Sequence, residues 1–173
     1  NTIELKKRKK NMTTQQLRTL QERGGEFLFD ELVKIPFILT GLSVPSNLII
    51  NQQVRQVDIF PTLCQLIGVS NDLGSINGRS LVPLLNEQSL TEEPAYIESG
   101  SVSTKKLGKV IGIRTTNYKY LRSRNDLTKN VTLYDLKNDP DETTNIAHSN
   151  EQIINEMERT LQKIRSGDIM DSP

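Results

Sequence analysis

The fold of this protein is decided by residues 109–136, which read KVIGIRTTNYKYLRSRNDLTKNVTLYDL. β-branched and tyrosine residues recur there in three short runs divided by polar turns: Lys109–Thr115, Tyr118–Arg122 and Val131–Leu136. Thr116-Asn117 is short enough to form a tight hairpin between the first two runs. A fourth run, Ala95–Glu98, precedes them. Short strands that follow one another in sequence favour an antiparallel meander, so we expect a small antiparallel sheet.

A helix is expected to follow this sheet at the C-terminal end. It begins at Ser149, because Gln152 three residues later completes a capping box. Gly167 ends it, and basic residues lie in its last turn. The residues on its apolar stripe are Ile153, Met157, Leu161 and Ile164.

A different pattern precedes the sheet. The continuous apolar run Ile35–Thr40 fits a strand buried on both faces, as in a parallel sheet covered by helices. Val57–Gly68 predicts a helix, with Asp58 as its N-cap, Pro61 in its first turn and Gly68 as its stop. The chain therefore reads as α+β: the edge of an α/β layer, then a small antiparallel sheet with a C-terminal helix.

Three segments follow from this pattern: residues 1–26, 27–90 and 91–173. The first is a basic lead-in with a short helix at Thr13–Arg23, the second the end of the α/β region, and the third the antiparallel sheet plus helix. Residues 1–23 carry a net charge of +5 and the remainder −4. A basic arm at residues 1–12 can contact nucleic acid or an anionic membrane, although basic termini are commonly just solvated.

Composition excludes several classes of protein. The chain has 173 residues, 35% of them hydrophobic, enough for one modest domain. No apolar run approaches the roughly 20 residues that cross a bilayer. One cysteine excludes an intramolecular disulfide framework and a multi-cysteine zinc site. No secretory signal is visible and the compartment stays open.

Few residues indicate chemistry. Cys64 lies on the expected core face of its helix, and His148, the single histidine, lies at a helix start where solvent exposure is usual. The acidic clusters that offer oxygen ligands to Mg²⁺ or Ca²⁺ are Asp30-Glu31, Glu92-Glu93 and Asp139/Asp141/Glu142. The last cluster is better explained as a capping box at Asp139, with Pro140 at the first helical position. Taken alone, these residues do not indicate a self-contained active site.

The order of short motifs resembles the C-terminal portion of sulfatases, in the alkaline-phosphatase-like superfamily. Phe29–Ile38 resembles their YEE-x-x-R-V-P-L-I segment, Val54–Gly68 their V-x-x-x-D-x-x-P-T-x-x-x-x-x-G helix, and Gly78–Leu85 their G-x-S-L-x-P-L-L segment. Ile113-Arg114 with Tyr118–Tyr120, and then Leu133–Ala147, are similar to their R-T-x-x-Y-K-Y and L-Y-D-L-x-x-D-P-x-E-x-x-N-L-A segments.

The resemblance implies a sulfuric ester hydrolase that uses a divalent cation, usually Ca²⁺, and a formylglycine nucleophile made in a C/S-x-P-x-R motif. That motif is absent here, as are the metal-binding Asp pair and the Asp-His-Gly segment, and Gly25 stands where many sulfatases carry a Lys. We therefore expect no catalytic or metal residue in this chain, whose nucleophile and cation would come from a missing N-terminal catalytic region.

Two functions follow as expectations. The first is the non-catalytic, cleft-forming C-terminal part of a sulfatase-like hydrolase that acts on an anionic sulfate ester. Arg114, Lys119 or Arg122 can then reach the substrate from the sheet, unless these charges form a solvated face. The alternative is a stand-alone module that binds a partner or polyanion through its basic arm, residues 1–12.

Overall fold

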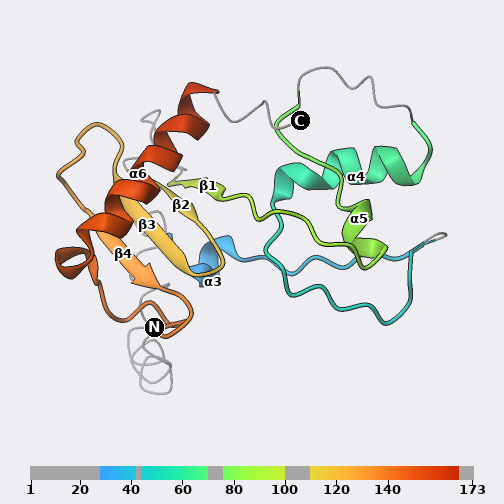
Figure 1. The fold of residues 1–173 in the computed structure, drawn as a ribbon, viewed down its shortest axis with the longest axis horizontal. Helices are drawn as coiled ribbons and strands as arrows, with labels where there is room; N and C mark the ends of the chain where they lie inside the picture. Colours follow the sequence, from blue (N-terminus) through green and yellow to red (C-terminus); the bar gives the residue numbers. More distant parts are fainter. Residues whose placement is uncertain (1–27, 42–43, 70–75, 100–109, 168–173) are drawn as a thin grey trace, which may run out of the picture. The chain divides into compact units, whose positions relative to one another are not determined.

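The computed structural model describes residues 28–41, 44–69, 76–99 and 110–167 (Figure 1). They form two compact units. Unit 1 comprises the described residues of 28–36 and 96–161, and unit 2 those of 37–95 and 162–167. The expected helix Thr13–Arg23 and the basic arm lie outside the described residues. No helix in the described part of the chain is long and apolar enough to cross a membrane.

Unit 1 is built on the predicted sheet. Its strands lie in the order β1-β2-β3-β4, and the pairs β2·β3 and β3·β4 are antiparallel. The strand bounds are β1 Ala95–Glu98, β2 Val110–Arg114, β3 Tyr118–Ser123 and β4 Thr132–Asp135. The hairpin at Thr116-Asn117 is confirmed, because Thr115 and Tyr118 flank it as hydrogen-bonded partners. The sequence therefore predicted both the sheet and its topology correctly.

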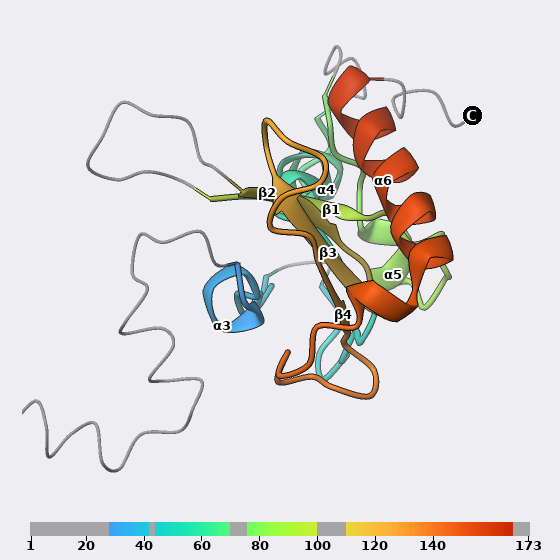
Figure 2. The same cartoon turned by 90° about the vertical axis from the view of Figure 1, so that its left-hand side faces the viewer.

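One face of the sheet packs under the C-terminal helix α6, Glu151–Ser166 (Figure 2). Ile113 lies opposite Tyr120 in the β2·β3 ladder, and Tyr120 lies opposite Leu133 in the next one, so the three share this face. All three are buried, as are Met157 and Leu161 on the predicted stripe of α6. Burying an apolar side chain of this size stabilises the fold by about 1.5–3 kcal/mol.

Helix α6 begins two residues later than predicted. A single 3-10 turn, η2 (Ala147–Ser149), precedes it, and Asn150 leads into the helix instead of Ser149. The Asn150 side chain donates to the carbonyl of Ile146 at 2.9 Å, which closes the 3-10 turn before the helix starts. The predicted end is confirmed, since Gly167 has the left-handed φ of 83° that follows a helix C-terminus.

The opposite face of the sheet carries a smaller apolar cluster. Leu28, Val110 and Leu121 are buried together, and the short helix α3, Asp30–Val33, begins just after Leu28. Figure 2 shows α3 on the side of the sheet away from α6. The sheet of unit 1 is thus covered on both faces by parts of its own unit.

Unit 2 contains the predicted helix, with one correction. It begins with a 3-10 turn, η1 (Gln56–Asp58), and continues as α4, Ile59–Leu66; the short helix α5, Val82–Leu85, follows. Asp58 stands at the predicted N-cap position of α4, but its side chain makes no capping hydrogen bond to that helix. Its buried carboxylate instead accepts hydrogen bonds from the backbone N–H of Arg55 at 2.9 Å and of Arg79 at 3.1 Å, and so ties two loops together.

The buried strand predicted at Ile35–Thr40 is wrong for this chain. The segment forms no strand, and its side chains are exposed apart from the half-buried Leu39, with Ile35 at 61% and Ile38 at 87%. A strand that is apolar on both faces needs a neighbouring strand on each edge and helices above and below it. The described residues of this chain do not supply that surrounding layer.

Candidate functional site

The densest group of charges in the described residues surrounds Lys119, on the face of the sheet that α3 covers. The Lys119 side chain is fully buried. Its Nζ lies 2.5 Å from Oδ1 of Asp30 and 2.7 Å from Oε1 of Glu142, and it donates to the carbonyl of Leu28 at 3.0 Å. Three oxygen atoms thus surround the ammonium group, as burial of this charge requires.

A second cation completes the cluster. Arg114 donates from Nε and Nη2 to the two carboxylate oxygens of Asp30, at 2.9 and 2.7 Å. Glu142 also accepts the backbone N–H of Asp30 at 2.6 Å, which caps the first turn of α3 from outside. We call Asp30, Arg114, Lys119 and Glu142 the charge cluster. Two acids balance two bases, so the cluster is neutral overall.

Burial and ion pairing shift the pKa values of the two carboxyls in opposite directions. Burial alone would raise the pKa of Asp30, but hydrogen bonds from Arg114 and Lys119 outweigh it and lower the pKa to about 2. For Glu142, burial outweighs the hydrogen bond from Lys119 and raises the pKa above its ordinary value. The two acids therefore differ in role: Asp30 is held ionised by two cations, whereas Glu142 is the more easily protonated.

Glu142 corrects a second expectation. The capping box predicted at Asp139 does not form, because no helix begins there; the Asp139 carboxylate instead binds Thr143 and Thr144 within a turn. That turn places Glu142 at a left-handed φ of 52° and directs it into the protein. Strain of this kind, about 1–3 kcal/mol, persists only where the surrounding contacts offset it.

The other face of the sheet holds a smaller ionic group. Arg122 is almost completely buried and donates from Nε and Nη2 to the two carboxylate oxygens of Glu158 on α6, at 2.8 and 2.9 Å. The Tyr120 hydroxyl donates to the same carboxylate at 2.9 Å, and burial together with Glu158 raises the pKa of Tyr120. This group joins α6 to β3.

The three cations considered for substrate binding therefore lie inside unit 1. Arg114 and Lys119 are paired with Asp30 and Glu142, and Arg122 is paired with Glu158. They are therefore not a solvated face of the sheet, and their charges are engaged by carboxylates of the same unit. Their chemistry is that of a clamp that fixes α3, the 139–142 turn and α6 on the sheet.

The other candidate residues stay apart. Cys64 is buried in α4, and His148 is exposed in η2. Glu93 forms ion pairs with Arg55 and Arg79 in unit 2. Within the described ranges, no group of three or more His, Cys, Asp or Glu side chains could hold a metal ion. Among the residues that the structure describes, the geometry therefore brings together structural ion pairs and no nucleophile with a base.

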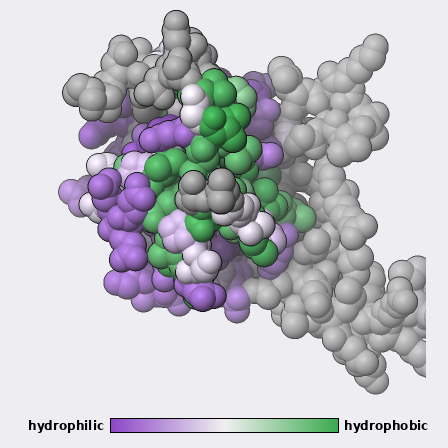
Figure 3. Space-filling model, turned by 90° about the vertical axis from the view of Figure 1, so that its right-hand side faces the viewer, coloured by the Kyte–Doolittle hydropathy of each residue, from purple (hydrophilic) through white to green (hydrophobic). Residues whose placement is uncertain are grey.

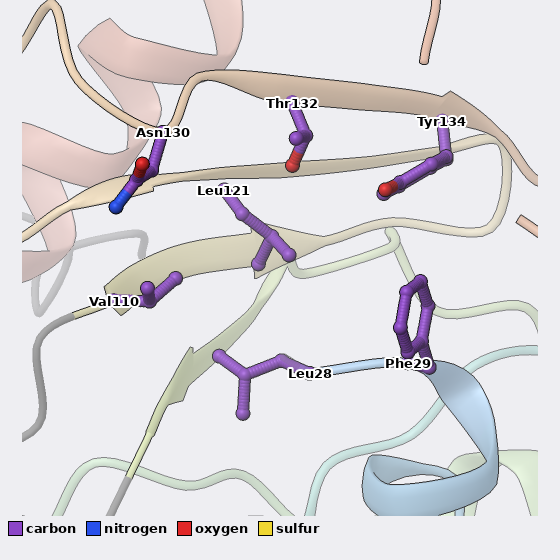
Figure 4. Close-up of a pocket in the computed structure, with 7 residues that line it drawn as sticks. All are labelled: Leu28, Phe29, Val110, Leu121, Asn130, Thr132 and Tyr134. Atoms are coloured by element: carbon purple, nitrogen blue, oxygen red, sulfur yellow. The ribbon is translucent and has the colours of Figure 1, made fainter. Parts of the chain in front are cut away.

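One small pocket opens beside the charge cluster in unit 1 (Figure 4). Its volume is about 170 Å³, and its lining residues are Leu28, Phe29, Val110, Leu121, Asn130, Thr132 and Tyr134. The Thr132 hydroxyl is buried without a hydrogen-bond partner among the described residues. The wall is mostly apolar, and its lining residues include no carboxylate, imidazole, amine or thiol that would serve hydrolysis.

The charge cluster predicts how the free energy of unfolding changes at acidic pH. The pKa of Asp30 is about 2 in the folded chain and ordinarily 3.8, so its stabilising contribution is complete above pH 4 and disappears as the pH falls towards 2. Glu142 acts in the opposite sense, because a raised pKa favours the folded state at low pH. Urea unfolding of the chain and of Asp30→Asn should show their stability difference narrowing by about 2 kcal/mol between about pH 5 and pH 2. Parallel pH profiles would contradict this assignment.

One protein family and several known proteins are similar to this chain. The profile of the family described as N-sulphoglucosamine sulphohydrolase, C-terminal, matches residues 24–167. Arylsulfatase K from Mus musculus is 28% identical over 143 residues, and Arylsulfatase K from Homo sapiens is 26% identical over the same length. Each match covers 79% of this chain and 26% of the relative.

Solved structures of other proteins are also similar to this chain. BT4656, solved in complex with its substrate D-glucosamine-2-N,6-O-disulfate, is 29% identical with a TM-score of 0.52, over 63% of this chain and 23% of that one. YidJ from Bacteroides fragilis, assigned as a sulfatase, is 26% identical with a TM-score of 0.53, over 61% and 23%. The chain thus spans about a quarter of the length of the relatives that it matches.

Proposed function

This chain belongs to the family of sulfatase C-terminal regions described as N-sulphoglucosamine sulphohydrolase, C-terminal, and from that membership we propose that it is the non-catalytic C-terminal part of a sulfatase-like hydrolase. The complete protein would hydrolyse a sulfate ester, a class to which the substrate of BT4656 belongs. This part would supply structure beside the cleft and leave the chemistry to a catalytic region outside the chain.

The observation that carries the proposal is the fate of the charged side chains in unit 1. Hydrolysis of a sulfate ester needs an activated nucleophile, a cationic group on the developing charge and a proton donor. The cations Arg114, Lys119 and Arg122 are engaged by carboxylates inside the unit. Cys64 is buried, and His148 has neither a thiol nor a carboxylate within its own turn. These residues build a scaffold.

A divalent cation belongs with the proposed catalytic region. The described residues do not fit one, because none of their acidic groups gathers three ligands. Ca²⁺, which the sulfatase resemblance favours, would in this proposal be held by the catalytic region and not by the described residues. Its chemistry there would be to stabilise negative charge on the transferring sulfate.

Reconstitution tests the proposal. The catalytic region encoded with this chain would be expressed with and without it, and turnover of 4-nitrophenyl sulfate would be measured in the presence of Ca²⁺. We expect the catalytic region alone to lose at least tenfold in turnover and to recover it when this chain is supplied. Full activity without this chain would contradict a structural role beside the cleft.

A further inference from the structure

The sequence contains one Asn-Gly pair, Asn77-Gly78, and it lies in unit 2. Asn77 is exposed and occupies a bend outside any helix or strand. An asparagine followed by glycine is prone to lose its side-chain amide, because glycine has no side chain to obstruct its own backbone nitrogen and its backbone adopts many conformations. The pair is therefore a candidate site of spontaneous covalent change.

The local backbone leaves this reaction open. In a helix or strand, the N–H of the residue after an asparagine is engaged in a hydrogen bond, which holds the nitrogen away from the side chain. Among the residues that the structure describes, neither the Asn77 side chain nor the N–H of Gly78 forms a hydrogen bond. The amide carbon of Asn77 and the nitrogen that would attack it are thus not held apart by secondary structure.

The backbone just after the pair is held tightly against η1. A Cβ atom at Gly78 would lie 2.0 Å from the carbonyl oxygen of Val57, so there is no room between these two backbones for even a methyl group. The N–H of the next residue, Arg79, donates to the buried carboxylate of Asp58 at 3.1 Å. The position of the backbone at Gly78 is therefore set closely by its neighbours.

The same backbone is also tied to α4. The N–H of Leu81 donates to the hydroxyl of Thr62 at 2.9 Å, and the Thr62 hydroxyl in turn donates to the carbonyl of Asp58 at 2.5 Å. Leu81 and Leu84 are buried. We call residues 78–84 the anchored segment, because contacts with η1 and α4 fix it from its first residue onward.

We propose that Asn77 is a site of spontaneous deamidation and that its isoaspartate product loosens the anchored segment from η1 and α4. The backbone nitrogen of Gly78 attacks Cγ of Asn77. The N–Cγ bond forms as the Cγ–Nδ2 bond breaks, and Nδ2 leaves as ammonia with the proton that the Gly78 N–H gives up. Water then opens the cyclic imide, giving isoaspartate when it attacks the main-chain carbonyl carbon and aspartate when it attacks Cγ.

The two products differ in the length of the backbone. In isoaspartate the chain runs through Cβ and Cγ, so the link from residue 77 to Gly78 is longer by one carbon atom. That atom enters directly before the close approach of Gly78 to Val57 and the hydrogen bond from Arg79 to Asp58. Aspartate adds the same negative charge with the normal backbone, so comparison of the two products separates backbone length from charge.

Loosening of the anchored segment would expose apolar side chains. Leu81 is 5% exposed and Leu84 7%. Unit 2 already exposes Phe60 at 58% and Ile67 at 73%, and Figure 3 shows hydrophobic side chains at the surface of the side that it views. The isoaspartate form should therefore bind the hydrophobic dye ANS more strongly than the unmodified chain.

Ageing of the 173-residue chain tests the site. The purified chain would be incubated at mildly alkaline pH, which speeds loss of the Gly78 proton, and peptide mapping by mass spectrometry would follow the conversion of each asparagine. Asn86 is the matched control, because it is also exposed in a loop of unit 2 but is followed by Glu87. We expect Asn77 to react at least tenfold faster than Asn86, and Asn77→Gln to abolish the conversion at this position. Equal rates at the two asparagines would overturn the site.

Comparison of the products tests the consequence. The isoaspartate form would be isolated from the aged chain by ion exchange, identified with an isoaspartyl methyltransferase, and compared with Asn77→Asp. We expect the isoaspartate form to unfold at a lower urea midpoint and to bind more ANS, whereas Asn77→Asp should match the unmodified chain. Equal midpoints for all three forms would show that the added backbone atom does not disturb the anchored segment. A midpoint lowered equally in Asn77→Asp would assign the effect to charge, and either result would overturn the proposal.

Discussion

Replacing Lys119 with methionine is expected to destabilise the chain by about 3–5 kcal/mol. Methionine fills a similar volume but removes the ammonium that lies between Asp30 and Glu142 in the charge cluster. Two carboxylates would then face each other in a buried site with only Arg114 to offset them. Urea unfolding followed by far-UV circular dichroism measures the loss, which is a large share of the 5–15 kcal/mol that a typical domain possesses.

Two companion variants separate charge from packing. Lys137→Met changes the same residue type at an exposed position, and its stability should stay within about 0.5 kcal/mol of the wild-type chain. Adding Glu142→Gln to Lys119→Met should recover part of the loss, because Asp30 keeps its pairing with Arg114 and the second change neutralises the Glu142 carboxylate that lost Lys119. Equal effects at Lys119 and Lys137 would show that the charge cluster does not hold unit 1 together.

Gly112→Ala is expected to cost about 3 kcal/mol or more. A Cβ atom at this position in β2 would lie 2.0 Å from the backbone carbonyl oxygen of Tyr120 and 2.7 Å from Cδ2 of Leu121. The carbonyl belongs to the neighbouring strand β3, so it can move away only if the β2·β3 ladder opens. We expect the variant to unfold at a clearly lower urea concentration.

Gly68→Ala is the matched control for this prediction. Gly68 follows α4 at a left-handed φ of 75°, and nothing lies within 4 Å of a Cβ built there. Its replacement should therefore cost only the backbone strain, about 1 kcal/mol. If the two alanine variants were equally mild, the close approach of β2 and β3 at Gly112 would not be a requirement of the fold.

The local parts of the fold were predictable from the sequence because they carry their own signals. The strands of unit 1 are short runs of β-branched and tyrosine residues between polar turns, and their pairing follows from the hairpin at Thr116-Asn117. Helix α6 has an apolar stripe that Met157 and Leu161 bury as expected. Its start shifted by two residues because Asn150 closes a 3-10 turn, a choice between two adjacent caps that spacing alone does not decide.

The errors arose where burial depends on distant residues. Ile35–Thr40 reads as a buried strand because its composition suits a covered sheet, but the described chain contains no such sheet. Glu142 fits a capping box by spacing, yet long-range pairing with Lys119 determines its place. Asp58 stands at the predicted N-cap position of α4, but its carboxylate links two loops instead of capping the helix.

One signal in the sequence could have revealed the charge cluster. The hairpin register places Arg114 directly opposite Lys119 on the same face of β2 and β3. Two cations in such positions repel each other unless acids lie between them. The acids that pair with them are Asp30, which precedes the strand-like run, and Glu142, which follows the sheet. The sequence alone does not identify these two acids, because both are far from Arg114 and Lys119 along the chain and only the fold brings them together.

The most direct test of the central claim is the sulfatase activity of the isolated 173-residue chain. Purified chain would be incubated with 4-nitrophenyl sulfate, with and without Ca²⁺, and the release of 4-nitrophenol would be followed. Because Arg114, Lys119 and Arg122 are paired internally and the described residues assemble no nucleophile with a base, we expect a rate equal to that of buffer alone under both conditions. Turnover that rises in proportion to the chain and with Ca²⁺ would contradict the account, since the chain would then contain an active site of its own.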